Sequence, residues 1–312
     1  MNAAPARTAS PAAIWTGMVV LYIVWGSTYL GMRFAIETIP PFLMAAARFL
    51  IAGGVMFTWR RLSGDPAPTR RQWRSAIIIG LFLLLGGNGG VVWAEQTVPS
   101  GIAALLVGAT PLWLVLIDEF LRRVAPGYRP GQARPGWIAI VGILLGFGGI
   151  ALLISPAQFS GLGEHIDLVG GLVLLLAALS WSAGSLYSRG ASLPESPLMA
   201  PAMEMLVGGS ALLVLGTLTG EWSKVDLAAI STRSLLGLGY LVVFGAVVGY
   251  ATYTWLLRNA PITLVSTYAY VNPIIAILVG NLLAAEPLTP RVLLAAAVIL
   301  GSVLLITWKR KK

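Results

Sequence analysis

The chain has 312 residues, of which 57% are apolar and only 11% carry a charge, against roughly 45–50% and about 25% in ordinary soluble domains. A water-soluble globule with so few charges would expose large apolar patches, so the composition indicates an integral membrane protein. The absence of cysteine and the single histidine, His165, exclude a disulfide scaffold, thiolate chemistry and a multi-histidine metal site.

Ten apolar segments, each close to the roughly 20 residues that a membrane-spanning helix needs, follow one another along the chain. They are too long for barrel strands and do not alternate, so helices are expected. Residues 1–13 are expected to form a disordered cytoplasmic tail. The predicted spans are residues 14–36, 41–59, 73–94, 100–120, 136–154, 168–188, 198–218, 234–256, 262–283 and 290–308.

Lysine and arginine positions predict the orientation of these spans, because cytoplasmic loops carry an excess of positive charge. With the N-terminus inside, sixteen of the 21 lysine and arginine residues fall on the cytoplasmic side, four fall outside, and Arg48 lies within a span. Both termini are therefore expected in the cytoplasm, with the protein in the cytoplasmic (inner) membrane. The net charge of +9 then reflects orientation and does not indicate nucleic acid as a partner.

An internal repeat divides the chain into two halves. A shift of 156 residues aligns four pairs of residues, and a shift of 162 aligns three more. The pairs are Trp25 and Trp181, Arg33 and Arg189, Pro41 and Pro197, Gly53 and Gly209, then Trp93 and Trp255, Pro99 and Pro261, Pro111 and Pro273. Each half contains five spans, and because five is odd, the halves would cross the membrane in opposite senses.

The sequence thus predicts an all-α integral membrane fold of ten transmembrane helices, arranged as two inverted-topology five-helix repeats. The repeats are residues 14–155 and 168–308, joined by a periplasmic linker at residues 156–167 and followed by a basic cytoplasmic tail at residues 309–312. Inverted repeats are typical of secondary transporters, whose substrate site lies near the bilayer midplane between the halves.

Several motifs in this order resemble the EamA-type branch of the drug/metabolite transporter superfamily, over nearly the whole chain. They are Val24-Trp25-Gly26-Ser27-Thr28-Tyr29, the run Val98-Pro99-Ser100-Gly101-Ile102-Ala103-Ala104 leading to Thr110-Pro111, and Asn272-Pro273 followed by Ala285-Glu286-Pro287-Leu288-Thr289. The resemblance implies a ten-helix carrier that exports amino acids, related metabolites or drugs. One departure is that Glu286 corresponds to Val124 in the first half, so a role shared by two acidic residues is not expected.

Two tryptophans, Trp25 and Trp181, lie inside their spans and are related by the repeat. Interfacial aromatic belts do not account for this position. The two rings either form walls of a central cavity, where their faces could stack on an aromatic substrate or attract its ammonium group, or serve ordinary packing and lipid contact. Their symmetry favours the cavity.

The third span carries Asn88 between two pairs of glycines, and its repeat counterpart is Tyr250. Close helix packing explains the glycines but not the amide. Asn88 and Tyr250 are predicted to form hydrogen bonds within the cavity, with an interhelical contact as the alternative.

Proline interrupts the fourth and ninth spans at Pro111 and Pro273, and each proline removes a backbone hydrogen bond. The orphaned carbonyls belong to Val107 and Ala269 and must find another partner. Interrupted helices in corresponding positions of two halves mark a transporter site, although a kink that only shapes packing is the alternative. Three polar residues near the prolines are included in the predicted site: Thr110, Tyr268 and Asn272.

Two ionisable residues within spans, Arg48 and Glu204, are related by the repeat and differ in sign. In an inverted repeat they would lie at opposite depths, so separate partners are expected, Glu37 for Arg48 and Arg189 for Glu204. Structural pairing or snorkelling and a gating or proton-relay role are both open. Glu95 is expected to be solvated near a helix end, with a place at an outward-facing mouth of the cavity as the alternative.

No nucleotide-binding or metal-binding motif is present, so no enzyme activity and no cofactor are predicted. The expected partners are a small-molecule substrate and the lipid bilayer; a monomer would suffice for transport, and the oligomeric state stays open. The predicted function is a secondary transporter of neutral or aromatic amino acids or related metabolites, working by alternating access. The alternatives are a carrier of nucleosides, sugars or drugs, a permease subunit of an ATP-driven complex, and a membrane scaffold or receptor.

Overall fold

The computed structural model describes residues 9–125, 137–154, 167–260, 262–265 and 267–308, and these residues form helices and connecting turns without any strand. The all-helical prediction is confirmed for this part of the chain. The tail at 309–312, His165 and all of the linker except Asp167 lie outside the described residues. The first helix begins at Pro11, inside the tail predicted at 1–13, because the Ser10 side chain accepts a hydrogen bond from the backbone N–H of Ala13 and caps it.

Seven helices in the described ranges are long and apolar enough to cross a membrane. Four of them are single helices: α1 (Pro11–Ala35), α2 (Pro41–Leu62), α9 (Leu168–Ser188) and α10 (Met199–Leu218). The other three consist of consecutive segments. Arg70–Ala94 contains α3 (Arg70–Gly80), η1 (Leu81–Gly89) and α4 (Gly90–Ala94); Ser100–Val124 contains α5 (Ser100–Gly108) and α6 (Thr110–Val124); and Thr232–Leu256 contains α11 (Thr232–Tyr240), η3 (Leu241–Tyr250) and the start of α12 (Ala251–Asn259). Shorter apolar stretches belong to α7 (Trp137–Ile154), α14 (Tyr268–Ala284) and α15 (Pro290–Trp308), while α13 (Ile262–Val265) is a single turn and η2 (Glu221–Lys224) is a 3₁₀ turn.

Three spans are irregular, and the sequence predicted an interruption in only one of them, the fourth. The helices η1 and η3 are π-helical and occupy corresponding parts of the third and eighth predicted spans. The fourth predicted span breaks at Ala109, between α5 and α6. Such irregular segments expose backbone carbonyls and are frequent at functional sites.

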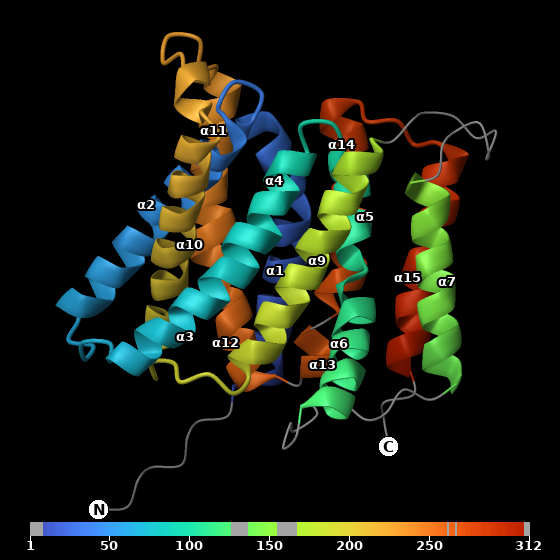
Figure 1. Ribbon diagram of the computed structural model, residues 1–312, viewed down its shortest axis with the longest axis horizontal. Coiled ribbons are helices and arrows are strands. Elements are labelled where there is room, and N and C mark those ends of the chain that lie inside the picture. Colours follow the sequence, from blue (N-terminus) through green and yellow to red (C-terminus); the bar gives the residue numbers. More distant parts are fainter. Residues whose placement is uncertain (1–8, 126–136, 155–166, 261, 266, 309–312) are drawn as a thin grey trace, which may run out of the picture.

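Helices from the two halves of the chain are interleaved (Figure 1). The helix α2 packs on α10, α7 on α15, α1 and α5 on α14, and α9 on η1. In the view of Figure 1, α1 rises from the lower edge whereas α9 descends from the upper edge, and the α2–α3 turn lies opposite the α10–α11 connection. The first helix of each half therefore runs in the opposite direction to its counterpart.

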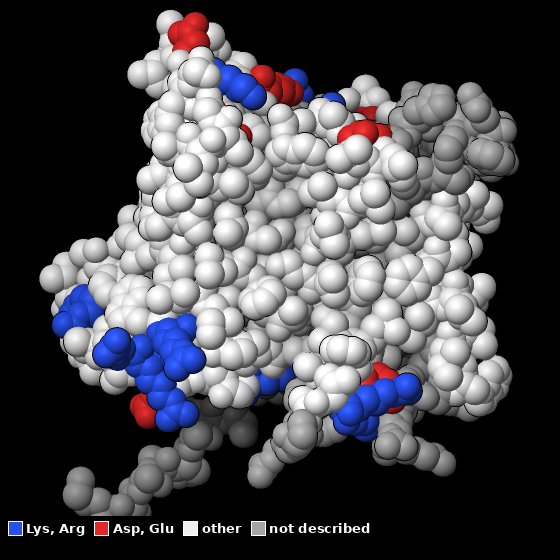
Figure 2. Space-filling view, in the orientation of Figure 1, with Lys and Arg blue, Asp and Glu red and all other residues white. Residues whose placement is uncertain are grey.

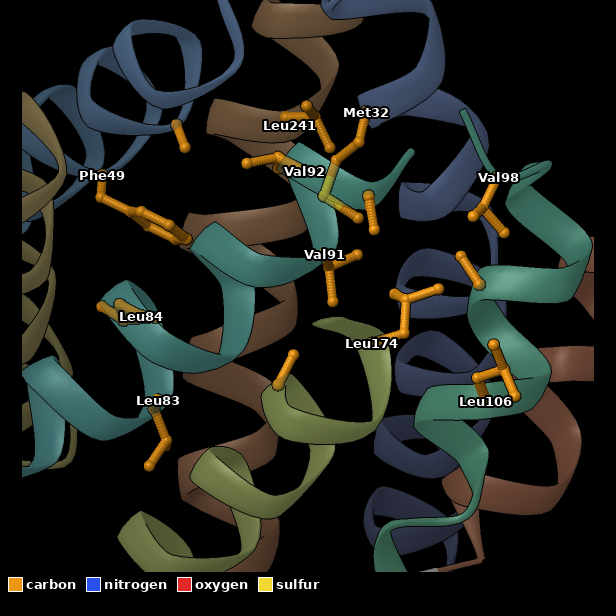
Figure 3. Packing of buried hydrophobic residues seen from close by; sticks show 14 of the residues in the cluster. Met32, Phe49, Leu83, Leu84, Val91, Val92, Val98, Leu106, Leu174 and Leu241 are labelled. Atoms are coloured by element: carbon orange, nitrogen blue, oxygen red, sulfur yellow. The ribbon is translucent and has the colours of Figure 1, made fainter. Parts of the chain in front are cut away.

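The main buried cluster draws side chains from both halves (Figure 3). Met32 and Phe49 of α1 and α2, Leu84 of η1 and Leu106 of α5 join Leu174 of α9 in one contiguous core. Because both halves contribute to this core, neither half has a complete hydrophobic interior of its own.

On the face drawn in Figure 2, charged side chains lie at the two edges and the surface between them is uncharged. In that view, lysine and arginine gather at the lower edge, and acidic groups with some basic ones lie at the upper edge. An apolar belt between two charged rims is the surface expected of a protein that spans a lipid bilayer.

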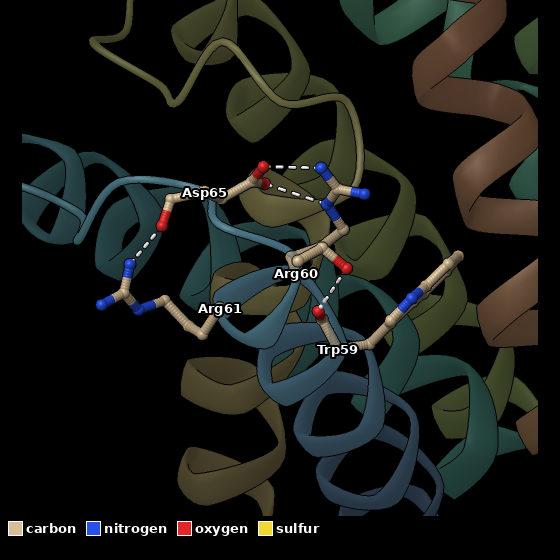
Figure 4. Close-up of polar contacts among 5 residues, drawn as sticks. Trp59, Arg60, Arg61 and Asp65 are labelled. Carbon is tan, nitrogen blue, oxygen red and sulfur yellow. Dashed lines mark hydrogen bonds and ion pairs between the residues drawn. The ribbon is translucent and has the colours of Figure 1, made fainter.

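The C-terminal end of α2 is fixed by a local ion pair (Figure 4). Arg60 donates from Nε and Nη2 to the two carboxylate oxygens of Asp65, at 2.9 and 2.5 Å, and Arg61 donates to the Asp65 backbone carbonyl. The hydrogen bonds from Arg60 lower the pKa of Asp65 below its ordinary value of 3.8.

Asp65→Asn is expected to lower the thermal stability slightly at neutral pH, as for exposed ion pairs. A carboxyl group whose pKa is lower in the folded than in the unfolded state stabilises the folded state. This stabilisation is fully present at pH values above the ordinary pKa, and it is lost as the pH falls through the lowered pKa. The stability difference between wild type and Asp65→Asn in detergent should therefore be present at pH 7 and disappear below the lowered pKa. A difference that is unchanged down to that pH would contradict the assignment.

Candidate functional site

An aromatic cluster is centred on Trp25 of α1. The Trp25 ring lies 6.1 Å from the Trp181 ring of α9 and 5.3 Å from the Tyr268 ring of α14, edge to face in both cases. The ring centroid of Tyr253, on α12, lies 4.9 Å from that of Trp25, and the ring centroid of Tyr250, on η3, lies 6.4 Å from it. The two repeat-related tryptophans thus meet, and each tyrosine places an apolar ring and a polar hydroxyl in the same region.

Glycines on the facing helices provide the space for these rings. A Cβ atom on Gly249 would lie 2.5 Å from Nε1 of Trp25, and one on Gly87 would lie 3.0 Å from Cε3 of Trp181. Gly87 and Gly249 correspond to each other under the 162-residue shift, so both halves seat their tryptophan in the same way. The indole of Trp25 also donates to the carbonyl of Gly245 at 3.3 Å, within η3.

The polar groups of this region are buried and incompletely hydrogen-bonded. Tyr250 donates its hydroxyl to Glu204 of α10 at 2.6 Å. Among the described residues, the side-chain oxygens of Asn88 and Asn272 and the Nε and Nη1 atoms of Arg48 are buried without a hydrogen-bond partner. Unsatisfied buried polar groups destabilise a protein unless a ligand or water reaches them, so these atoms mark a binding region.

The two proline interruptions differ in how their free carbonyls are accommodated. Thr110 donates its hydroxyl to the Val107 carbonyl at 2.6 Å, which replaces the bond that Pro111 removes. In α14, Gly108 of the neighbouring α5 packs on the kink, since a Cβ there would lie 2.9 Å from Cγ of Pro273. The kink at Pro273 therefore lies against α5, whereas the free carbonyl at Pro111 is satisfied locally by Thr110.

Thr110→Val is expected to lower the free energy of unfolding by about 1–3 kcal/mol, because the buried carbonyl of Val107 would lose its donor. Thr110→Ser keeps the hydroxyl and should retain most of the stability. Thermal unfolding of both variants in the same detergent measures the difference. Equal loss in the two variants would show that the hydroxyl is not the stabilising group.

These residues surround a cavity of about 90 Å³, room for a few water molecules. All six predicted substrate-binding residues lie on its wall, together with Thr110, Pro273 and Arg48: Trp25, Asn88, Trp181, Tyr250, Tyr268 and Asn272. Pro111 and Glu204 are not on the wall; Pro111 acts through the break in the helix, and Glu204 lies behind Tyr250.

Sequence reasoning omitted parts of this wall. No predicted substrate-binding residue lies on α2, yet α2 contributes Arg48 and Phe49 to the wall, and α1 contributes Tyr29 in addition to Trp25. The aromatic Tyr253, which contacts Trp25, was missed as well. A usable signal existed for two of them: Arg48 is a charge inside a span, and Tyr253 follows Tyr250 at the three-residue spacing that keeps side chains on one helix face.

The partners expected for the buried charges are different in the structure. Glu37 forms an ion pair with Arg233 at 3.3 Å, not with Arg48, and Glu204 accepts from Tyr250. Glu95 is fully buried rather than solvated, and both its carboxylate oxygens lack a hydrogen-bond partner in the described structure. The short hairpins place the expected partners near in sequence, but packing between the halves decides which charges meet.

No group of three or more metal-binding side chains of the His, Cys, Asp or Glu type is found among the residues that the structure describes. The site is consequently built from aromatic rings, amides, hydroxyls and one guanidinium. This chemistry suits reversible binding of an organic molecule.

Comparison with known proteins supports the same class of molecule. A model described as the EamA-like transporter family matches residues 13–155 and again residues 168–308. The uncharacterized inner membrane transporter YedA of Escherichia coli (strain K12) is 37% identical over 296 residues, which cover 94% of this chain and 90% of that protein. A WAT1-related chloroplastic protein of Arabidopsis thaliana is 27% identical and covers 94% of this chain and 69% of its own length.

A solved crystal structure has the same fold. Its TM-score is 0.62 at 22% sequence identity, and the match covers 97% of this chain and 99% of the other. At this identity the likeness concerns the fold alone.

Proposed function

Since the chain belongs to the EamA-like transporter family and is a multi-pass membrane transporter with two EamA repeats, we propose that it exports neutral or aromatic amino acids, or closely related small metabolites, by alternating access. The observation that carries this proposal is the cavity, where Trp25, Trp181 and Tyr268 face the buried amides of Asn88 and Asn272. Aromatic faces attract ammonium groups and stack on aromatic side chains, and the amides supply hydrogen bonds.

The charge of the wall argues against phosphorylated substrates. Arg48 is the basic residue on the cavity wall, whereas phosphate recognition relies on clustered arginine or lysine. A substrate with no net charge or a zwitterion fits this wall better than a sugar phosphate or nucleotide sugar.

The proposed mechanism rests on ten spans arranged as two inverted repeats. The paired contacts of Trp25 with Gly249 and Trp181 with Gly87 support it, as do the opposite directions of α1 and α9 in Figure 1. The two halves would rock about the cavity and expose it to each side of the membrane in turn. With no nucleotide-binding motif in the sequence, transport would follow the substrate gradient or be coupled to an ion, and one chain would suffice.

Both termini are proposed to be cytoplasmic in the inner membrane. The lysine and arginine distribution supports this orientation. Because the chain lacks cysteine, single cysteines at Ser63 and Ala229 can be labelled selectively in intact cells. Ala229→Cys should react with an impermeant maleimide from outside and Ser63→Cys should not; labelling of both from one side would contradict the inverted arrangement.

Uptake by proteoliposomes tests the substrate. The purified chain is expected to move neutral and aromatic amino acids, and a panel with nucleosides and sugars, with and without a pH gradient, identifies the class and the coupling. Asn88→Leu with Tyr250→Leu should abolish transport, whereas Tyr187→Leu, at an exposed tyrosine of α9, should leave it unchanged. Transport of nucleosides or sugars instead would refute the substrate class, and a need for a partner ATPase would refute the secondary carrier.

A further inference from the structure

Arg48 of α2 is a buried cation with unfilled hydrogen-bonding capacity. The residue is 4% exposed, lines the cavity, and leaves both Nε and Nη1 without a hydrogen-bond partner. Removing a guanidinium from water is costly unless a partner accepts its hydrogen bonds. A cation held in this state at a cavity wall therefore points to an anionic group that arrives with a ligand.

The surroundings hold the guanidinium beside the aromatic cluster. A Cβ on Gly245 would lie 2.9 Å from Nη2 of Arg48 and 3.0 Å from Cγ2 of Thr28, and the carbonyl of the same glycine accepts from Trp25. The absence of a side chain at Gly245 thus lets the charge and the indole meet at one backbone position. A ligand bound there would contact both.

Glu95 does not complete an ion pair with Arg48. Arg33 donates to the backbone carbonyl of Glu95, at 2.6 Å, and not to its carboxylate. Both carboxylate oxygens of Glu95 are buried without a hydrogen bond, so the donors of Arg48 remain available. Glu95 therefore leaves the hydrogen-bonding positions of Arg48 open.

Unfilled acceptors on the same wall complement these donors. The side-chain oxygens of Asn88 and Asn272 are buried without partners, and both residues line the cavity. Donors at Arg48, acceptors at the two amides and aromatic rings nearby together match three parts of one molecule: a carboxylate, an ammonium group and an apolar side chain.

We infer that Arg48 binds the carboxylate of the transported molecule, so that the substrate class is α-amino acids with a free carboxyl group. This inference rests on the proposed function and adds to it a recognition residue and a required substrate group. A guanidinium binds a carboxylate through two parallel hydrogen bonds, which lysine cannot reproduce. Amines and amides of the same amino acids should consequently be poor ligands.

Binding of matched ligand pairs to the purified full chain in detergent tests the inference. Wild type is expected to bind L-phenylalanine at least about tenfold more tightly than L-phenylalaninamide, and 3-phenylpropionate more tightly than 3-phenylpropanol, since charge-assisted hydrogen bonds are the stronger class. In Arg48→Gln both ratios should fall to about one, and in Arg48→Lys they should be intermediate. Arg233→Gln, at an arginine paired with Glu37 outside the cavity, is the matched control and should keep the wild-type ratios.

The outcomes separate this inference from the proposed function. Equal wild-type affinity within each pair, binding of no carboxylate, or a preference that survives Arg48→Gln would overturn the role of Arg48. A third outcome is that 3-phenylpropionate binds in an Arg48-dependent manner but no amino acid binds. This result would refute the amino-acid function and the α-amino-acid substrate class, and Arg48 would remain a carboxylate-binding residue. If Arg48→Gln does not fold, the affinity ratios of wild type and of Arg48→Lys still test whether Arg48 binds the carboxylate.

Discussion

Replacing Trp25 or Trp181 with alanine is expected to weaken substrate binding by roughly 30-fold, because each ring contributes about 2 kcal/mol of stacking or cation–π attraction in a desolvated site. The two rings pack edge to face on the cavity wall, with their centroids 6.1 Å apart. Replacement with phenylalanine keeps an aromatic face and should recover part of the affinity. Binding measurements on the purified variants and uptake by proteoliposomes provide two independent readouts.

Trp15→Ala is the matched control, since Trp15 lies on the same helix as Trp25 but is 55% exposed at the outer surface. It should leave binding unchanged. Gly249→Leu gives a complementary test, because a side chain at Gly249 would displace the Trp25 ring and should reduce binding without removing an aromatic residue. Unchanged affinity in Trp25→Ala and Trp181→Ala would refute the role of the rings as walls of the site.

Features that depend on local sequence or on the repeat could be predicted. The helical class follows from the length and composition of the apolar runs. The orphaned carbonyl of Val107 follows from Pro111, and its new donor is the adjacent Thr110. The meeting of Trp25 with Trp181 follows from their equivalence in two repeats that share one cavity.

Features that depend on how distant helices pack could not be predicted. The helix α2 reaches the cavity with Arg48 because the π-helical η3 and Gly245 lie against it. The sequence marks Arg48 as a charge inside a span, but it does not say which helices pack against it. The same holds for Glu204, whose partner is set by the approach of Tyr250 from η3, and for carboxylates that cap helices of the other half.

Two such carboxylates replace the capping side chains that α2 and α5 lack. Both helices follow a proline that provides no side-chain cap. Glu221 accepts hydrogen bonds from the backbone N–H groups of Phe42 and Leu43, at 3.2 and 2.9 Å. Glu286 accepts from Ser100 and Gly101, at 2.8 and 3.1 Å. A negative charge at a helix N-terminus is favourable, and here it also ties the second half of the chain to the first.

The backbone around Glu286 is shaped for this contact. Ala285 adopts a left-handed φ of 51°, which turns the chain back at the end of α14. Gly280 leaves space for the carboxylate, since a Cβ there would lie 2.5 Å from Oε2 of Glu286. The counterpart in the first half, Val124, is 54% exposed. The first half therefore has no carboxylate at the position that corresponds to Glu286.

Glu286→Ala is expected to lower the free energy of unfolding by about 2–4 kcal/mol, because two backbone donors at the start of α5 lose a charged acceptor. Glu221→Ala should have a similar effect through α2, and Glu286→Gln should retain part of the stability because one amide oxygen can still accept. Reversible unfolding in mixed detergent measures these differences. Glu37→Ala is the control, since its ion pair with Arg233 is largely exposed and such pairs contribute about 0–1 kcal/mol. A loss in Glu286→Ala no larger than in Glu37→Ala would show that the cap does not hold the two halves together.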